Sequence, residues 1–380
     1  MESYSRCYTN INLTAIGHNI DEVRRKVGDS VKIMAVVKAN AYGHGAVAVS
    51  KYLEEKVNYY GVATVEEAIE LRQAGITLPI LILGYTSPKQ FSYVVKYDIT
   101  QTIYAYEDGK VLNAVANHFG KCAKIHVAID TGMTRIGFPV DDRIDESIKD
   151  IKGLTQLSNI QLEGAFTHFS CADMYDKTYF YMQKDALNRF FAKCDDAGIE
   201  IPIKHAANSA SIMEFEDMCL NMVRSGIITY GLYPSEEVDK TVLNLKPAME
   251  FKTHVVKVND VREGTGVSYG ATFITDKPMK IATLSVGYAD GYKRSLSNVG
   301  RVLIRGQFAS VVGRVCMDQL MVDVSHIPDV KVEDEVTLFG RDGENIIPVE
   351  EIAELSGSFN YEYICSVSER VKRIYIEAEK

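Results

Sequence analysis

The 380-residue sequence lacks several patterns that mark whole classes of protein. No apolar segment follows its first residues, and its most apolar run, 78–83, is far too short to cross a bilayer. Acidic residues outnumber basic ones, with a formal net charge of −9, and no basic stripe is present. This charge balance argues against nucleic acid or an anionic membrane as a partner. We therefore expect a soluble, cytoplasmic protein with no membrane and no nucleic acid as partner.

Spacings typical of disulfide frameworks and metal sites are also missing. The seven cysteines are odd in number, scattered, and include no C-x-x-C pair. The eight histidines show neither H-x-x-x-H nor H-x-H spacing. We expect most cysteines to be buried thiols in a reducing compartment, and we expect no bound metal.

The sequence that is present falls into two parts, as the length of the chain leads one to expect. Through the first 230 residues, apolar runs alternate with amphipathic, helix-like stretches. The strand candidates lie at about 31–37, 59–63, 79–84, 99–104, 124–130, 160–167, 203–207 and 221–225. Eight strands with helical crossovers predict an α/β fold, a TIM-like (β/α)8 barrel, over residues 1–240.

From about residue 246 the pattern changes to short β-type runs separated by Gly, Asp and Asn turns. These runs lie at 249–258, 279–287, 301–305, 308–315, 319–324 and 333–339. They predict a second, mainly β C-terminal domain over residues 241–380. Two polar clusters, 266–270 and 312–319, are out of place in a purely structural module.

The stretch 33–45 carries the strongest single chemical signal. Its five apolar residues, 33–37, predict a strand buried on both faces, and this strand ends at Lys38. Gly43 and Gly45 permit a tight turn or a close approach to a ligand, and Tyr42 offers a hydroxyl nearby. An amine beside such a loop points to an aldehyde cofactor held as a Schiff base. Because a solvated lysine at a strand end is far commoner, Lys38 needs support from the rest of the chain.

Other polar side chains follow the predicted barrel strands where those strands end, which is the edge at which barrel enzymes carry out chemistry. These strand ends carry Arg135, His168, Asn208, Ser209 and Arg224. Barrels often bind phosphate with the loops after strands seven and eight, through backbone N–H groups and hydroxyls. Ser209, Gly226 and Ile227 fit that role.

Nine motifs run in order along the chain from about residue 8 to residue 375. They are VVKANAYGHG, DTGMTRIGF, THFSCAD, HAANSA, NMVRSGIITYGLYPS, GVSYGATF, VGYADGY, VGRVCMDQLMVD and NYE. Together they resemble the motifs of the pyridoxal-phosphate-dependent alanine racemases. The resemblance implies an isomerase that interconverts L- and D-alanine with pyridoxal 5'-phosphate and supplies D-alanine for peptidoglycan. It also implies a homodimer in which the C-terminal domain of each subunit completes the partner's active site.

The resemblance assigns catalytic roles to four residues. Lys38 would hold the cofactor and act as one base, and Tyr269 of the other subunit would act as the second base on the opposite face of the substrate. Arg224 cannot give up its proton readily, so it would donate a hydrogen bond to the pyridine nitrogen instead of protonating it. His168, polarised by Arg224, would assist Tyr269.

Binding roles follow from the same resemblance. Arg135 and the backbone N–H of Met317 would hold the substrate carboxylate. The cofactor would be bound by Lys38, Tyr42, Arg135, His168, Asn208, Ser209, Arg224, Gly226, Ile227 and Tyr361. In one respect the sequence departs from many members of the family, which have a carbamylated lysine seven residues before the motif arginine; this chain has Ala128 there. Another group must therefore orient Arg135.

Three other functions share parts of this pattern. Some serine racemases of the same family carry a membrane segment and a smaller residue in place of Tyr361, and this sequence has neither feature, which favours alanine over a serine-preferring or broad-specificity enzyme. Non-catalytic proteins of pyridoxal-phosphate homeostasis have the barrel lysine but only one domain and no second base. Decarboxylases on a similar barrel use a cysteine motif that is not found here.

Overall fold

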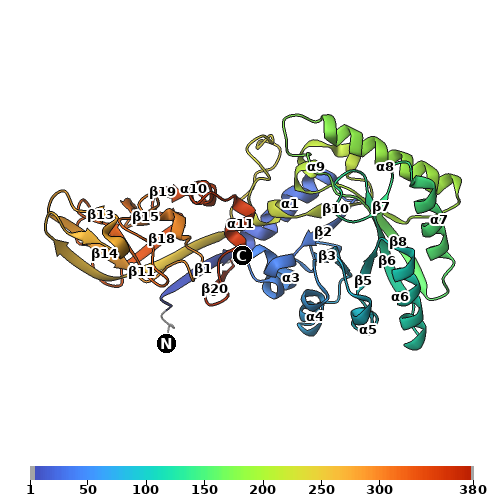
Figure 1. The fold of residues 1–380 in the computed structure, drawn as a ribbon, viewed down its shortest axis with the longest axis horizontal. Coiled ribbons are helices and arrows are strands. Elements are labelled where there is room, and N and C mark those ends of the chain that lie inside the picture. Colours follow the sequence, from blue (N-terminus) through green and yellow to red (C-terminus); the bar gives the residue numbers. More distant parts are fainter. Residues whose placement is uncertain (1–4, 378–380) are drawn as a thin grey trace. The chain divides into compact units, whose positions relative to one another are not determined.

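The computed structural model describes residues 5–377, and the chain divides into two compact units (Figure 1). The barrel unit consists of residues 15–41 and 46–247. The β unit consists of the described parts of 1–14, 42–45 and 248–380. Each unit has its own sheet and its own buried core.

The barrel unit is built on a ring of eight parallel strands. In chain order these are β2 (Lys32–Val36), β3 (Tyr59–Val62), β4 (Ile80–Ile82), β5 (Thr100–Ile103), β6 (Ala123–Asp130), β8 (Ile160–Phe166), β9 (Ile203–His205) and β10 (Met222–Ser225). The short β7 (Phe138–Pro139) pairs with β6. Backbone hydrogen bonds from Asn221 N–H to Lys204 O (3.2 Å) and from Arg224 N–H to Ala207 O (3.0 Å) join β9 to β10. All eight predicted barrel strands are confirmed, and most of their residues are buried, although β5, β8 and β9 include polar residues.

Helices lie around the outside of this ring (Figure 1). They are α1 (Leu13–Val27), α3 (Ala46–Leu53), α4 (Val65–Gln73), α5 (Phe91–Lys96), α6 (Tyr106–His118), α7 (Ile144–Thr155), α8 (Thr178–Asp196) and α9 (Ser209–Glu214), with 3-10 turns η1 (Pro88–Gln90), η2 (Glu216–Met218) and η3 (Ile227–Tyr230). The start of α4 shows why the sequence folds locally as it does. Thr64 accepts a hydrogen bond from Glu67 N–H, and the Glu67 carboxylate accepts one from Thr64 N–H, so both ends of this capping box are satisfied.

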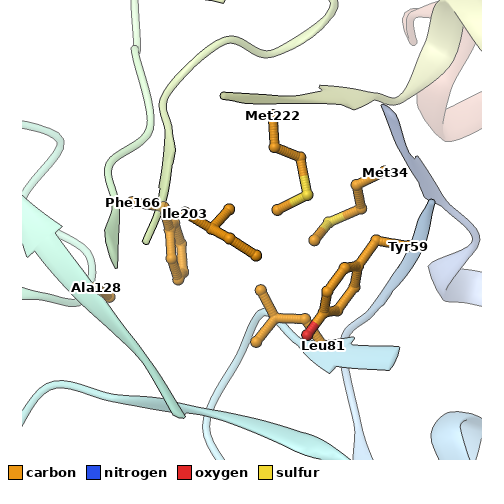
Figure 2. Close-up of a cluster of buried hydrophobic side chains, with 7 residues drawn as sticks. All are labelled: Met34, Tyr59, Leu81, Ala128, Phe166, Ile203 and Met222. Carbon is orange, nitrogen blue, oxygen red and sulfur yellow. The ribbon is translucent and has the colours of Figure 1, made fainter. Parts of the chain in front are cut away.

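Side chains fill the interior of the barrel. Figure 2 shows a cluster to which seven of the eight strands contribute one buried side chain each: Met34, Tyr59, Leu81, Ala128, Phe166, Ile203 and Met222. Burying a large apolar side chain stabilises a fold by about 1.5–3 kcal/mol. The centre of the barrel is therefore a packed core, and the strand ends are where polar side chains gather.

The β unit confirms the prediction of a second, mainly β domain. Its main sheet has the strand order β16-β15-β18-β11-β1-β20, with β14, β17 and β19 paired beside it. The bounds are β1 (Cys7–Asn12), β11 (Met249–Val261), β14 (Met279–Leu284), β15 (Arg301–Ile304), β16 (Gln307–Ser310), β17 (Leu320–Asp323), β18 (Glu335–Asp342), β19 (Asn345–Ile347) and β20 (Lys372–Ile376). The smaller elements are β12 (Gly266–Val267), η4 (Tyr269–Ala271), β13 (Phe273–Ile274), η5 (Arg294–Leu296), α10 (Val349–Leu355) and α11 (Asn360–Cys365).

Three findings bear on the classes of protein considered from composition. Among residues 5–377, no helix has both the length and the apolar character needed to cross a bilayer. The same residues contain no group of three or more His, Cys, Asp or Glu side chains arranged to hold a metal ion. The expectation that most cysteines are buried is wrong, since only Cys7, Cys194 and Cys219 are buried while the other four thiols are half-buried or exposed.

Gly43 is a position where a side chain should be poorly tolerated. It has a φ of +82°, and a Cβ added there would lie 2.4 Å from the backbone oxygen of Ile364 in the same unit. Gly28 has a similar φ of +79° but has no atom within 4 Å of an added Cβ. Gly28→Ala should therefore lower the free energy of unfolding by roughly 1–2 kcal/mol, the cost of a left-handed alanine.

Gly43→Ala should lower the free energy of unfolding by a further ~1–3 kcal/mol, because a backbone carbonyl cannot swing away as a side-chain end can. Urea unfolding of the two variants beside the parent chain measures the difference. Equal losses for Gly28→Ala and Gly43→Ala would contradict the close contact with Ile364.

Candidate active site

A left-handed turn fixes Lys38 at the carboxyl end of β2. Ala39, Asn40, Ala41 and Tyr42 all have φ between 51° and 54°, in the turn designated α2 (Lys38–Tyr42). Each L-residue in this conformation costs roughly 1–2 kcal/mol, so such a run persists only where contacts enforce it. Ala39 N–H donates to the Glu67 carboxylate (2.7 Å), and the Asn40 side-chain oxygen accepts from Ala46 N–H (2.8 Å). The position of Lys38 is thus set by a strained but well-tied backbone.

His168 lies close to the positively charged side chains predicted for the rim. It follows β8, and its Nδ1 accepts a hydrogen bond from Nη2 of Arg224 (3.2 Å). Burial first, and then the positive charges of Arg224, Arg135 and Lys38, hold the pKa of His168 well below its usual value. The structure therefore brings together four predicted site residues that come from four different strand ends.

Arg224 is buried among backbone carbonyls at the end of β10. Its Nη2 donates to Thr167 O (2.7 Å) and Ala206 O (2.9 Å), and its Nη1 donates to His205 O (3.0 Å). Within residues 5–377, Nε–H has no hydrogen-bond acceptor. Burial and the charge of Arg135 lower the pKa of Arg224 to about 9, which still leaves the guanidinium protonated at neutral pH. Arg224 therefore offers one directed donor, its Nε–H, to a ligand.

His205 belongs to this group, although it was not among the predicted site residues. It is the last residue of β9, and its Nδ1 lies 3.1 Å from Nη1 of Arg224. Burial, followed by the influence of His126 and Arg224, holds the pKa of His205 well below its usual value. In the sequence, His205 is the first residue of the motif HAANSA and lies within the predicted strand 203–207, which is a weak signal for a role of its own.

The stability of the folded chain should fall as the pH drops below about 6.5, the pKa of an ordinary histidine. His168 and His205 stay neutral in the folded chain, whereas the unfolded chain takes up a proton on each ring. Because the unfolded state then binds more protons, stability rises with pH, and each ring removes up to about 1.4 kcal/mol per pH unit on acidification.

Thermal unfolding between pH 7 and pH 5.5 tests this expectation. His118→Gln is the matched control, because it removes an exposed histidine at the end of α6 and leaves both buried rings in place. A melting temperature that stays constant across this pH interval would show that the buried rings are not held neutral.

The predicted phosphate-binding corner is formed by two helix starts that lie side by side. α9 begins at Ser209 and η3 begins at Ile227, and Gly226 N–H donates to Ser209 Oγ (3.1 Å). The first N–H groups of a helix have no acceptor within the helix, which suits them to an anion. The Asn208 side chain instead accepts from Ser211 N–H (3.1 Å) and donates to Phe169 O (3.1 Å). Asn208 therefore shapes this corner by capping α9.

Arg135 lines a small pocket that opens to solvent. Ala128, Asp130 and His168 also line it. Ala128 is buried opposite Phe166 on the neighbouring strand (Figure 2). The Asp130 carboxylate accepts the N–H groups of residues 132 and 134 (3.0 Å each). Across the described chain, the Arg135 side chain has no hydrogen bond or ion pair, so no protein group takes the place of a carbamylated lysine.

In the β unit, the two polar clusters noted in the sequence lie against each other. Ser268 Oγ donates to Arg314 O (2.6 Å), which ties the segment before Tyr269 to the segment before Met317. Tyr269 is 71% exposed and Met317 is 53% exposed. The N–H of Tyr288, itself 42% exposed, donates to Cys316 O (3.0 Å). The β unit thus presents three exposed side chains, Tyr269, Tyr288 and Met317, on segments that are hydrogen-bonded to one another.

Tyr42 and Tyr361 also lie together within the β unit. Their ring centroids are 6.2 Å apart with an interplanar angle of 50°. Tyr42 is buried, and burial raises the pKa of its hydroxyl well above the usual value. These two tyrosines come from opposite ends of the sequence, so only the fold brings them together.

The rim of this (β/α)8 barrel carries a lysine, a histidine, two arginines and two helix starts. These groups define an enzyme of the class that works at the carboxyl ends of barrel strands. The comparison with known families is specific. The model of the alanine racemase N-terminal domain matches residues 11–234, and that of the alanine racemase C-terminal domain matches residues 248–375. The chain belongs to the alanine racemase family and is an isomerase.

Relatives with this name are similar over nearly their whole length. The chain is 50% identical to the alanine racemase of Methanococcus maripaludis over 370 residues, which covers 97% of this chain and 98% of the relative. It is 49% identical to an alanine racemase of Clostridium perfringens over 369 residues, covering 97% and 95%. A solved alanine racemase of Clostridium difficile has a TM-score of 0.95 at 46% identity, covering 99% of this chain and 97% of that one.

Proposed function

We propose that this chain interconverts L- and D-alanine with pyridoxal 5'-phosphate held on Lys38. One observation carries the proposal: Arg224, on the strand that pairs with the one leading to Lys38, donates to His168 (3.2 Å), and His168 lines one pocket with Arg135, at the rim where barrel enzymes work. The second unit and its match to the C-terminal family model distinguish the chain from single-domain cofactor-carrier barrels. We assign to this activity the supply of D-alanine for peptidoglycan, with a cytoplasmic site of action.

The residues on the rim fit this cofactor. The N–H groups at the starts of α9 and η3, with Ser209 Oγ, suit its phosphate, and the Arg224 Nε–H suits a ring nitrogen that accepts a hydrogen bond. Tyr42 and Tyr361 are the further phosphate-binding hydroxyls in this proposal. When bound, pyridoxal phosphate supplies an electron-withdrawing ring that makes the Cα–H of an amino acid acidic.

Two bases of different type then account for racemisation. Lys38 Nζ removes or returns the Cα proton on one face, and Tyr269 Oη does so on the other, so that inversion needs no rotation of the substrate. Tyr269 is exposed in the single chain, which makes it available to a second subunit. We therefore propose a homodimer in which Tyr269 and the backbone N–H of Met317 serve the partner's site.

Hydrogen-bond direction fixes where the protons lie around these bases. The Arg224 guanidinium only donates, so the His168 Nδ1 that faces it must be the acceptor, and the proton of the neutral ring is on Nε2. His168 thus presents an N–H to the second base. Arg135 keeps its donors free of protein acceptors within the described residues, in keeping with a role in binding the substrate carboxylate.

Incubation of the purified chain with L-alanine and pyridoxal phosphate in heavy water tests the proposed function. L- and D-alanine should converge to equal amounts, with deuterium at Cα of the product. L-Serine in a parallel reaction should turn over more slowly. Absence of both racemisation and exchange with the cofactor-loaded chain would refute the proposal.

A further inference from the structure

A chain of hydrogen-bonded side chains runs through the interior of the barrel unit from Arg224. Arg224 Nη1 lies 3.1 Å from His205 Nδ1, His205 Nε2 lies 2.8 Å from His126 Nδ1, and His126 Nε2 lies 3.2 Å from Glu163 Oε2. Tyr59 donates to the same Glu163 oxygen (2.6 Å). We call Arg224, His205, His126 and Glu163 the polar chain. Its two histidines are completely buried, and the proposed mechanism uses only its Arg224 end.

The direction of every hydrogen bond in the polar chain follows from its ends. Arg224 has no acceptor atom, so His205 Nδ1 accepts and the His205 proton is on Nε2. His126 Nδ1 must then accept from His205, which puts the His126 proton on Nε2, facing Glu163. A carboxylate only accepts, so it closes the sequence without conflict. All the donors therefore point from Arg224 towards Glu163.

Glu163 also bears on the charge of Arg224. Arg224 is a buried cation, and within residues 5–377 no carboxylate lies at ion-pair distance from it. Burial alone would raise the pKa of Glu163, but hydrogen bonds from His126 and Tyr59 outweigh burial and lower it to about 2. The carboxylate is therefore ionised, and burial keeps both rings between the two charges neutral. An uncompensated buried charge is strongly destabilising, and Glu163 is the counter-charge that the polar chain connects to Arg224.

The backbone is shaped to hold this arrangement. In the pairing of β6 with β8 the register shifts, so that Gly164 pairs with His126 while Glu163 has no pairing partner on β6. Such bulges re-aim a side chain. A Cβ on Gly164 would lie 2.7 Å from two atoms of the His126 ring and 2.7 Å from Ile203 O, so only glycine leaves room for the imidazole.

We propose that Glu163 is a positioning residue for racemisation: acting through His126 and His205, its carboxylate holds Arg224 in the orientation that aims Nε–H at the cofactor and Nη2 at His168. This inference rests on the proposed function. The competing explanation is an ordinary surface ion pair, since Lys124 Nζ lies 3.8 Å from the other Glu163 oxygen. Such exposed pairs contribute little.

The first test needs no reaction. Nitrogen-15 NMR of the histidine-labelled wild-type protein should show the His126 and His205 rings neutral at pH 7, each with its proton on Nε2; His126→Gln and His205→Gln assign the signals. A cationic ring, or a proton on Nδ1 of either residue, would overturn the polar chain. Because this readout does not depend on racemisation, it remains decisive even if the proposed function fails.

The second test separates positioning from surface pairing. Glu163→Gln removes the charge at constant shape and should lower kcat for alanine about tenfold with KM changed less than about twofold, the usual scale for a residue behind the site. Lys124→Gln, which removes only the surface pair, should leave both constants unchanged. Glu163→Asp should restore part of kcat. Equal effects of Glu163→Gln and Lys124→Gln would refute the proposal.

The last test compares the loss of kcat in a double variant with the losses in the two single variants. If Glu163 acts through His126, the Glu163→Gln/His126→Gln double variant should lose about tenfold in kcat, as each single variant does, whereas independent roles would multiply to about a hundredfold. Multiplication would overturn the inference. Tyr59→Phe, which removes one of the two donors to the carboxylate, serves if Glu163→Gln does not fold. It should give a smaller fall in kcat, and an unchanged kcat would count against the inference. A wild-type chain that does not racemise alanine would refute the proposed function alone.

Discussion

Lys38→Ala should abolish alanine racemisation in both directions, with kcat lowered by at least about ten-thousandfold. The loss should exceed that of a single general base, because Lys38 is proposed both to hold the cofactor and to move the Cα proton. Lys32→Ala is the matched control, since Lys32 is an exposed lysine at the opposite end of the same strand, β2. It should retain wild-type activity.

Covalent labelling makes the same prediction without turnover. Borohydride treatment of the cofactor-loaded wild-type chain should fix pyridoxal phosphate to the peptide that contains Lys38, and the Lys38→Ala chain should remain unlabelled. Residual activity above about a hundredth of wild type, or a label on another lysine, would remove Lys38 from its proposed role.

Much of the barrel could be predicted because its signals are local. A strand buried on both faces is an apolar run, and residues at the ends of parallel strands share one edge, so Lys38, His168 and Arg224 could be expected together before any coordinates. In the structure, Arg224 Nη2 lies 3.2 Å from His168 Nδ1. The left-handed backbone from Ala39 to Tyr42 was not predictable, because alanine and tyrosine carry no preference for it.

The features that the sequence did not predict depend on contacts between residues far apart in the chain. β1 lies at the start of the chain yet pairs with β11 and β20 in the β unit, and nothing within residues 7–12 indicates those partners. His126 and His205 are 79 residues apart, and each is the single histidine of its strand. A pattern that is meaningful only after two distant strands become neighbours cannot be recognised from spacing. The sequence therefore predicted the residues of the rim, including Arg224, but not that His205, His126 and Glu163 are hydrogen-bonded to one another behind Arg224.

A dimer made of one Lys38→Ala subunit and one Tyr269→Phe subunit should be active, although either substitution in a homodimer should lower kcat at least about a hundredfold. If Tyr269 serves the partner's site, one of the two sites in the mixed dimer has both defects and the other has none. Differently tagged subunits, co-expressed and purified through both tags, should then show about half of the wild-type activity per dimer.

The reverse combination gives the opposite result and so acts as the control. A dimer of one wild-type subunit and one subunit with both substitutions has, under shared sites, one site without Lys38 and one without Tyr269, so it should be nearly inactive. If each site were made within one chain, this dimer would have about half of the wild-type activity and the split dimer would have almost none. Failure to recover any doubly tagged dimer would contradict the homodimer itself. The exposure of Tyr269 in the single chain is the observation that makes shared sites the expected outcome.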